Sequence, residues 1–197
     1  MESDLEMVRG WRNAPEVRRY MYTTHEIGPG EHLAWFARIS KDHGQRWFVY
    51  EDERGVPAGV VNVLLPRPGH SAMWGFYAAP GSRLGTGSRM EFESLDLFFL
   101  QMSFHKLSCE VLANNAKVIK LHQKFGFVEE GRFRSECLFG NDYVDVVRLG
   151  ILAKEWQARR PALAARLGLD AQIRGEALSD FGSLRGECQT FNSDKTK

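Results

Sequence analysis

The feature that most constrains the fold of this chain is a change of hydrophobic period at Pro80. Before Pro80, three short runs rich in β-branched and aromatic residues are separated by glycines and prolines, which is typical of antiparallel strands joined by turns. After it, over 88–104, apolar residues recur at the spacing of a buried helix face. The strand-like runs are 46–52, 58–65 and 71–79, and the helical positions are Phe92, Leu95, Phe99 and Met102. A small antiparallel meander that leads into a long buried helix is therefore predicted at the centre of the chain.

The segments on either side of this centre predict a single α+β domain. Helices are predicted before the meander, with a break at Asn13-Ala14-Pro15, where the proline suits the first turn of the second piece. After the long helix come a strand, a helix, a hairpin that turns at Gly140-Asn141-Asp142, and a last helix. The predicted ranges are 2–22 and 31–42 for the first helices, 107–113 for the strand, 115–125 for the next helix, 127–139 and 143–153 for the hairpin, and 153–167 for the last helix. We expect one domain over 1–168 with a central mixed, mostly antiparallel sheet flanked by helices, and a polar, mobile tail over 169–197.

Composition and charge limit the partners of the protein. The formal net charge is +1, so no overall attraction to nucleic acid or to an anionic membrane is expected. The acidic first residues do not resemble a secretory signal, and no apolar run approaches the roughly 20 residues that cross a bilayer. Three cysteines without close spacing, Cys109, Cys137 and Cys188, favour free thiols in a reducing cytoplasm, and the six histidines show no metal-ligand spacing. We therefore expect a cytoplasmic protein that holds no metal.

The segment SRLGTGSRM at 82–90 joins the third predicted strand to the long helix. Gly85 and Gly87 remove Cβ atoms where the backbone must turn and where a ligand can approach closely. The N–H groups in the first turn of a helix lack partners within the helix and carry partial positive charge, so such an end binds phosphate. The lysine of a P-loop and the third glycine of a dinucleotide-binding turn are both absent. An ordinary strand-to-helix turn is the alternative that this segment alone leaves open.

A second motif, NAKVIKLHQKFGF at 115–127, follows the glycine turn after the long helix and one more strand. The two motifs at this spacing resemble the Gcn5-related N-acetyltransferases, and the resemblance covers about residues 4–155. It implies a sheet splayed between the fourth and fifth strands of the family, where acetyl-CoA inserts with its pyrophosphate on the glycine turn. The cofactor contacts that it implies are Tyr77, Ala78, Leu84, Gly85, Thr86, Gly87, Ser88, Asn115, Val118, His122, Lys124 and Phe125. Asn115 is expected either to cap the helix or to contact pantetheine.

Two features depart from the pattern of that family. Ser82 stands where the family usually opens the turn with Gln or Arg, and Arg83 beside it is a substitute for that charge. The first strand of the family normally precedes the helix that begins near Met1, so here the strand is absent or the start of the sequence is misassigned. A missing strand would leave one edge of the sheet exposed.

The resemblance assigns catalytic roles to two residues. His122 occupies the position of the family's tyrosine, which protonates the departing thiolate, and a histidine can supply a proton in the same way. The alternative is a helix histidine that only packs against coenzyme A. Glu110 lies on the strand before this helix, on the same face as Ser108 and Leu112, and could accept a proton from the substrate ammonium. Its alternative is a salt bridge or a charge at the edge of a strand.

The acceptor amine depends on the first helices, where the segment 11–36 also carries a resemblance. It resembles the sugar-nucleotide N-acetyltransferases of pseudaminic acid biosynthesis at Arg12, Asn13, Val17, Arg18, Met21, Ile27, Glu31 and His32. That resemblance implies acetylation of the 4-amino group of a UDP-4-amino-4,6-dideoxy-N-acetyl sugar of the altrosamine type, used in flagellin or surface glycans. The substrate contacts expected from it are Arg12, Arg18, Met21, Tyr22, Trp35 and Trp74. Met21, Trp35 and Trp74 are equally consistent with core positions.

Two other functions remain open from the sequence. The same scaffold could acetylate a protein N-terminus, a polyamine or an antibiotic amine, although a polyamine favours an acidic cleft and this segment offers Arg12, Arg18 and Arg19. A domain that binds acetyl-CoA without turnover is the third reading, and a homodimer is a possible assembly. Coenzyme A binding without thiol release would identify the inactive domain.

Overall fold

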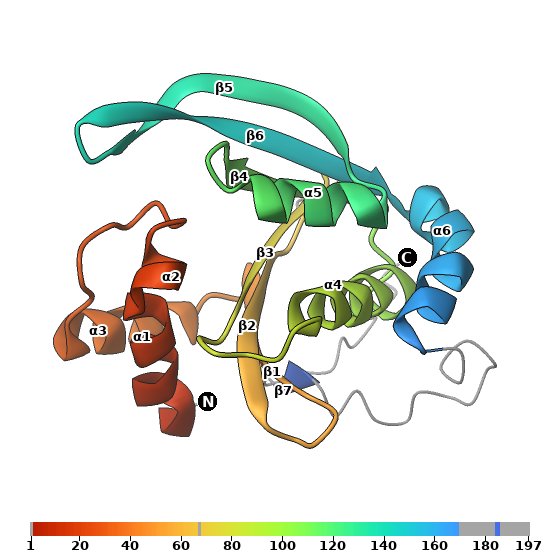
Figure 1. Cartoon of the computed structure of the whole chain (residues 1–197). Coiled ribbons are helices and arrows are strands. Elements are labelled where there is room, and N and C mark those ends of the chain that lie inside the picture. Colours follow the sequence, from red (N-terminus) through yellow and green to blue (C-terminus); the bar gives the residue numbers. More distant parts are fainter. Residues whose placement is uncertain (1, 67, 170–183, 186–197) are drawn as a thin grey trace.

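The computed structural model describes residues 2–66, 68–169 and 184–185 (Figure 1). One sheet organises these residues, with the strand order β5-β6-β4-β3-β2-β1-β7. The strands are β1 (Gln45–Glu51), β2 (Pro57–Leu64), β3 (Ala72–Ala78), β4 (Lys106–Leu112), β5 (Val128–Phe139), β6 (Asp142–Leu152) and β7 (Leu184–Arg185). The helices are η1 (Glu2–Asp4), α1 (Leu5–Asn13), α2 (Pro15–Arg18), α3 (Pro29–Ile39), α4 (Thr86–Asp96), η2 (Leu97–Gln101), α5 (Ala116–Phe125) and α6 (Ala153–Leu167).

The sheet opens between β3 and β4. These strands are parallel and pair only at Ala72 with Leu107 and at Met73 with Ser108, whereas the other neighbouring strands pair antiparallel. We call the place where β3 and β4 part beyond Met73 and Ser108 the wedge. The predicted mixed, mostly antiparallel sheet is confirmed, and the wedge is the splay expected within it.

Helices cover both faces of the sheet (Figure 1). One face packs against α4, α5 and α6, and most of the buried apolar residues belong to this side. The other face packs against α1, where Val8 lies with Val49 and Val60 in a smaller cluster. We call these the α4/α5 face and the α1/α2 face. Alternation along a strand places neighbouring residues on opposite faces, so the two sides of the wedge have different surroundings.

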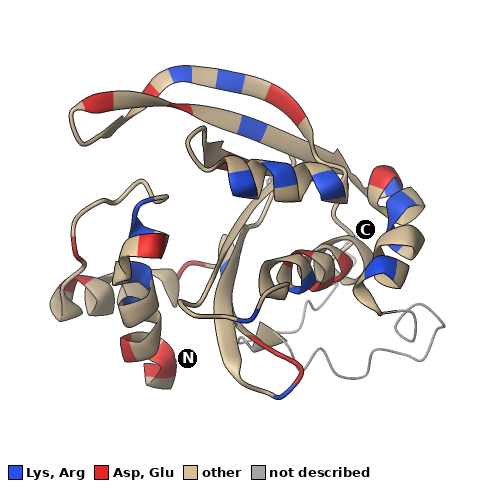
Figure 2. Ribbon diagram, in the orientation of Figure 1, with Lys and Arg blue, Asp and Glu red and all other residues tan. Residues whose placement is uncertain are grey.

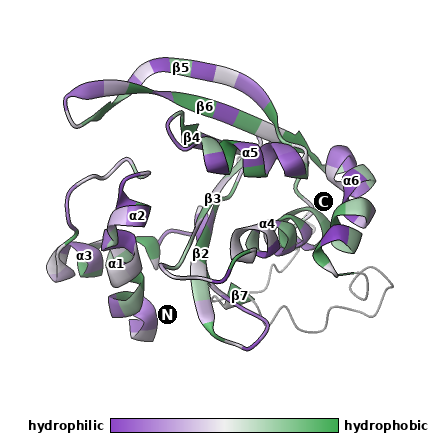
Figure 3. Ribbon diagram, in the orientation of Figure 1, coloured by the Kyte–Doolittle hydropathy of each residue, from purple (hydrophilic) through white to green (hydrophobic). Residues whose placement is uncertain are grey.

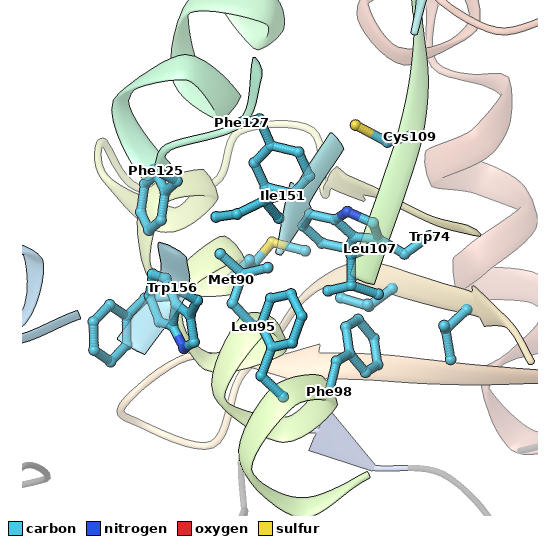
Figure 4. Packing of buried hydrophobic residues seen from close by; sticks show 14 of the residues in the cluster. Trp74, Met90, Leu95, Phe98, Leu107, Cys109, Phe125, Phe127, Ile151 and Trp156 are labelled. Atoms are coloured by element: carbon cyan, nitrogen blue, oxygen red, sulfur yellow. The ribbon is translucent and has the colours of Figure 1, made fainter. Parts of the chain in front are cut away.

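The long helix predicted after the meander has more buried residues than any other helix of the described ranges. Figure 3 shows the hydropathy along it, and Figure 4 shows Met90, Leu95 and Phe98 packed in the core. The predicted stripe is confirmed at Phe92, Leu95 and Phe99, which are buried, whereas Met102, its last position, follows the helix and is half-buried. Beyond Asp96 the helix continues as the π-helical segment η2, in which the consecutive residues Phe98 and Phe99 both face the core. A π-turn is wider than an α-turn, which changes the direction of successive side chains.

The edge of the sheet at β1 is paired where we expected an exposed edge. β7 pairs antiparallel with β1, with Leu184 opposite Tyr50, and the Leu184 side chain is buried. Apart from Leu169 and β7, the predicted tail lies outside the described residues, as does Cys188. Cys109 and Cys137 are free thiols. Within the described ranges, no helix is both long enough and apolar enough to cross a membrane.

Candidate active site

The α1/α2 side of the wedge is held together by the guanidinium of Arg148 on β6. Its Nη1 donates to Glu110 Oε1 at 2.9 Å and its Nη2 donates to Ser108 Oγ at 3.0 Å. Nη1 also lies 3.5 Å from the sulfur of Met73. Arg148 stands opposite Glu110 in the β4–β6 register, and Met73 and Ser108 are the last paired residues of β3 and β4. One side chain therefore joins three strands at the point where the sheet opens.

Glu110 also receives a hydrogen bond from a distant part of the chain. The hydroxyl of Tyr22, which follows α2, donates to Glu110 Oε2 at 3.2 Å. The Glu110 side chain is 26% exposed, so solvent reaches it. Burial, and then the charge of Glu110, raise the pKa of Tyr22 far above neutrality, so Tyr22 remains a phenol that can donate. The predicted sharing of a face by Ser108 and Glu110 is confirmed, because Arg148 contacts both.

A second acidic side chain lies close to Tyr22. Glu136 and Cys137 belong to β5, in the region where its pairing with β6 is interrupted between Phe133 and Cys137. Both residues also raise the pKa of Tyr22. The pKa of the Cys137 thiol is itself raised by burial and by the charges of Glu136 and Glu110. The β5–β6 hairpin extends over the first helices and carries charges of both signs (Figure 2), and on the α1/α2 side of the wedge the carboxylates of Glu110 and Glu136 both act on Tyr22.

The α4/α5 side of the wedge holds His122, and its surroundings are dry. His122 Nδ1 lies 2.8 Å from Glu91 Oε1, and the two side chains are 3% and 0% exposed. The rings of Trp74, Phe76 and Phe127 surround the imidazole, with centroids 5.6, 5.8 and 5.0 Å away. Figure 4 shows Trp74 and Phe127 in this apolar cluster with Cys109 beside them. His122 is therefore in the core next to the wedge.

The protonation of this pair is set by burial and by mutual attraction. Burial alone lowers the pKa of His122, but the Glu91 carboxylate and Cys109 raise it to about 10. Burial raises the pKa of Glu91, and the nearby imidazolium only partly offsets this. Because a buried carboxylate at hydrogen-bonding distance favours the charged imidazole, we expect His122 to hold two protons at neutral pH.

The glycine turn forms a cavity at the N-terminal end of α4. Gly85 has φ of 94°, a left-handed conformation that favours glycine. The cavity has an empty volume of about 630 Å³ and is lined by Tyr50, Asp52, Glu53, Arg83, Leu84, Gly85, Thr86 and Arg89. The N–H groups of Thr86, Ser88 and Arg89 bond to carbonyl groups of the turn, whereas those of Gly85 and Gly87 make no such bond within the described residues.

The departure at Ser82 has a structural reason. Its hydroxyl donates to the carbonyl of Ala58 at 3.2 Å, so it closes the turn onto β2 and does not face the cavity. Arg83 lines the cavity instead, and so does Arg89, whose Nε lies 3.2 Å from Glu53 Oε1. The Gly85 amide with Arg83 and Arg89 in one cavity fits a diphosphate, while Asp52 and Glu53 also line this cavity and Glu53 pairs with Arg89.

The other residues predicted to contact the cofactor lie in several places. Ala78 is next to the α4/α5 core, Val118 packs on the same core, and Phe125 is buried within it against Trp156. Asn115 precedes α5 but its side chain makes no cap hydrogen bond. The remaining predicted positions are Tyr77 on the α1/α2 face, the fully exposed Leu84, and Lys124 in the last turn of α5.

The residues predicted to contact the substrate are not all brought together. Tyr22 reaches Glu110, and Met21 and Arg18 lie just before it in the chain. Trp35 lies elsewhere, 4.9 Å in centroid distance from Trp47 on β1. The remaining positions are Trp74, on the α4/α5 face, and Arg12, whose Nη2 donates to the Thr23 carbonyl at 3.2 Å while its Nη1 is buried without a partner among the described residues.

Two residues of the site were not predicted from the sequence. Glu91 stands among the buried residues of α4, where a charged residue between Met90 and Phe92 gave no sign of being buried. Arg148 is found only from the register of β4 against β6. In the described ranges, no group of three or more His, Cys, Asp or Glu side chains is placed to hold a metal ion.

The chain matches known proteins over most of its length. The model of a family described as the acetyltransferase (GNAT) domain matches residues 1–128. A spermidine N(1)-acetyltransferase from Vibrio cholerae is 27% identical over 158 residues, which cover 79% of this chain and 91% of that protein. An L-amino acid N-acetyltransferase from Escherichia coli is 26% identical over 145 residues, which cover 72% of this chain and 88% of that protein.

A solved structure shares the arrangement of strands and helices described above. The crystal structure of spermidine N-acetyltransferase from Vibrio cholerae in complex with CoA and spermine gives a TM-score of 0.72 at 26% identity, and the match covers 80% of this chain and 94% of that chain. By their names these relatives act on a polyamine or on amino acids, so the resemblance to sugar-nucleotide enzymes is not confirmed.

Proposed function

We propose that the acceptor of this protein is a small primary amine of the polyamine class. The chain belongs to the GNAT acetyltransferase family and is an acetyl-CoA-dependent N-acetyltransferase. The observation that carries this acceptor class is the Glu110 carboxylate, which accepts from Tyr22 on the α1/α2 side of the wedge, with the charge of Glu136 acting on the same phenol. Carboxylates on the acceptor side attract a polycation and disfavour an anion. The spermidine N(1)-acetyltransferase relative acts, by its name, on such an amine.

The arginines of the first helices do not oppose this acceptor. Arg12 is bonded to a carbonyl within its own segment, and the guanidinium of Arg19 lies 4.8 Å from the ring centroid of Tyr20. Within the described residues, neither side chain forms a hydrogen bond or an ion pair with Glu110 or Tyr22, whereas Arg148 forms an ion pair with Glu110 and balances its charge. The expectation that the arginines disfavour a polyamine is therefore weakened for Arg12 and Arg19, which make contacts within their own segment.

The parts of the site fit acetyl-CoA at two points. The glycine turn offers the amide of Gly85 together with Arg83 and Arg89 for the diphosphate. At the wedge, the indole N–H of Trp74 is buried without a partner among the described residues, so a donor is available to an inserted amide chain. We therefore place Trp74 on the cofactor side of the site and not on the acceptor side.

The two sides of the wedge divide the acid–base chemistry. In the reaction the amine nitrogen attacks the thioester carbon, the carbon–sulfur bond breaks, and the sulfur leaves with the electron pair. Glu110 accepts the proton that the ammonium must lose before it attacks, and Arg148 and Tyr22 fix the orientation of its two oxygens. His122, on the other side of the sheet, donates a proton toward the departing sulfur.

A second acceptor class is an amino-sugar nucleotide, such as the altrosamine derivative that the first helices suggested. The specific observation in its favour is the buried Nη1 of Arg12, a cationic donor without a partner among the described residues. Burial also lowers the pKa of Arg12, so a bound anion would relieve a real cost. This acceptor requires the diphosphate of the sugar nucleotide to reach Arg12 on the α1/α2 face.

The test is a measurement of thiol release from acetyl-CoA with three acceptors: spermidine, a UDP-4-amino-4,6-dideoxy sugar and an amino acid. We expect spermidine to give the largest kcat/KM, and Glu110→Gln to lower that value about 100-fold, as loss of a general base does. Asp142→Asn, which removes an exposed carboxylate in the turn of the hairpin, is the matched control and should change it less than about 2-fold. Preference for the sugar nucleotide, with loss of that activity in Arg12→Met, would replace the polyamine by the second acceptor.

A further inference from the structure

The position of His122 relative to the wedge defines which groups control it. Trp74 and Cys109 directly follow the last paired residues of β3 and β4, Met73 and Ser108. The imidazole lies against Trp74 and interacts with Cys109, so it sits where the two strands part. From α4, the carboxylate of Glu91 faces it, and from β4, the side chain of Cys109 does. Its neighbours on β3 and before β5 are aromatic and do not titrate.

Burial of the Glu91 carboxylate lowers the stability of the fold. Its side chain is fully buried on α4, and its Oε2 has no hydrogen-bond partner among the described residues. A buried ion pair is often no more stable than well-packed apolar residues of similar volume, and an unpaired oxygen adds a further cost. Asp96 on the same helix is different, because Arg160 and Trp156 bond both of its oxygens. Packing therefore explains Asp96 but does not explain Glu91.

The geometry gives Glu91 a specific effect on the imidazole. Its Oε1 accepts from His122 Nδ1 at 2.8 Å, so Glu91 engages this ring nitrogen and the proton that can be given away is the one on Nε2. The Cys109 side chain also hydrogen-bonds the imidazole. We propose that Glu91 is the positioning residue of the acid: it holds His122 by Nδ1, keeps the ring protonated, and leaves Nε2–H to donate toward the departing sulfur. This assignment rests on the proposed acid role of His122 in the N-acetyltransferase reaction.

The proton balance of this step closes through exchange with solvent. Cleavage of the carbon–sulfur bond leaves the electron pair on sulfur, and the sulfur takes the proton from Nε2. The imidazole becomes neutral and still donates Nδ1–H to Glu91. The proton taken from the ammonium by Glu110 passes to solvent, and solvent returns one to His122, so no other reactant is required. With Glu91, a histidine reaches a pKa of about 10, close to the value of about 10 that a tyrosine has without help.

Because a tyrosine has this pKa without a carboxylate beside it, the proposal is tested by a double-mutant cycle of Glu91→Gln and His122→Tyr. In the wild-type background we expect Glu91→Gln to lower kcat for spermidine about 10–100-fold, in the range of a lost partner of a functional histidine, with KM for acetyl-CoA changed less than about 3-fold. In the His122→Tyr background, Glu91→Gln should change kcat less than about 2-fold, because the phenol needs no carboxylate. A purely structural role predicts the same factor in both backgrounds, and that result would overturn the proposal.

A second measurement does not depend on turnover or on the folding of His122→Tyr. The imidazole resonances of His122 are followed by NMR in the ligand-free protein between pH 6 and 10, with wild type and Glu91→Gln compared. We expect the wild-type ring to keep both protons through pH 8 and the Glu91→Gln ring to titrate at least two pH units lower. Titration at the same pH in both proteins, or a neutral ring at pH 7 in the wild type, would contradict the assignment.

The two measurements also separate this proposal from the proposed function. Thiol release with an amine establishes the transferase whatever Glu91 does. A protein that releases no thiol with any amine but shows the expected NMR titration would retain the contact and lose the acid role. Normal turnover in Glu91→Gln would remove Glu91 from the mechanism and leave the transferase intact.

Discussion

The two sides of the wedge both pair a glutamate with a cation, but in opposite surroundings. Glu91 and His122 are shut in the core between α4 and α5, whereas Glu110 and Arg148 lie on β4 and β6 with about a quarter of each side chain exposed. Among the described residues, Glu91 has one hydrogen-bond partner, His122, and Glu110 has two, Arg148 and Tyr22. The two ion pairs therefore differ in their exposure to solvent and in their hydrogen bonding.

The difference shows how burial divides the chemistry of one reaction. In the buried pair, Glu91 keeps the imidazole of His122 protonated and fixes its orientation, so that only Nε2 can give a proton to a reactant. This suits an acid that must be charged at neutral pH. A half-exposed carboxylate exchanges protons with water and attracts a cationic substrate, which suits a base on the acceptor side. The sheet separates these environments, and the wedge is the place where they meet.

Breaking each pair should give the largest contrast in stability. His122→Leu leaves Glu91 buried without its partner, and removal of one member of a buried pair costs about 3–5 kcal/mol of unfolding free energy. Glu110→Gln leaves Arg148 half-exposed and bonded to Ser108, so about 1 kcal/mol or less is expected. Urea denaturation of the two variants at pH 7.5 measures both values. Equal losses would show that the two sides do not differ in burial as described.

Replacing the whole dry pair should separate stability from catalysis. In the double variant Glu91→Met with His122→Phe, apolar side chains fill the same space, and the unfolding free energy should return to within about 1–2 kcal/mol of the wild type. Turnover should nevertheless fall about 100-fold, because the acid is gone. Urea denaturation and thiol release on one preparation provide the two numbers. A double variant with near-normal turnover would mean that the dry pair is structural only.

The pH dependence of stability should differ between the wild type and a variant of the dry pair. The folded-state pKa of His122 is raised to about 10, above the value of about 6.5 in the unfolded chain. Its contribution is therefore fully present below pH 6.5 and is lost as the pH rises through 10. We expect the unfolding free energy to fall more steeply between pH 7 and 10 in the wild type than in Glu91→Gln. Urea midpoints at pH 7, 8.5 and 10 test this, and parallel profiles would contradict the raised pKa.

The smallest effect is expected on the half-exposed side. Tyr22→Phe removes one hydrogen bond to Glu110 from a side chain that is 59% exposed, so stability should change by less than about 0.5 kcal/mol. The carboxylate then loses one of its two orienting partners, and kcat/KM for the amine should fall about 3-fold. Thiol-release kinetics at varied spermidine concentrations measure it. A loss as large as that of Glu110→Gln would mean that Tyr22 itself touches the reacting amine.

Much of the fold followed from local patterns in the sequence. Helix and strand periods predicted nearly every element, and the glycine turn was placed correctly because the left-handed Gly85 and the first turn of α4 are local features. The face of Glu110 was also predictable, because alternation along a strand needs no knowledge of its neighbours. The acceptor side was predicted less well: Tyr22 reaches Glu110, but Trp35 lies at β1 and Trp74 lies in the core.

What the sequence by itself determined is the order of the elements, the opposite faces of β4, and the family to which the two motifs point. Only the tertiary structure decided that β3 and β4 part after Met73 and Ser108, that Arg148 spans this point, and that Glu91 is buried against His122. The physical reason is that a period reports which face of an element is apolar, whereas a partner on another element depends on strand register and helix packing. A lone charge in an apolar helix looks like a solvent-facing residue until the structure shows which other helix covers it.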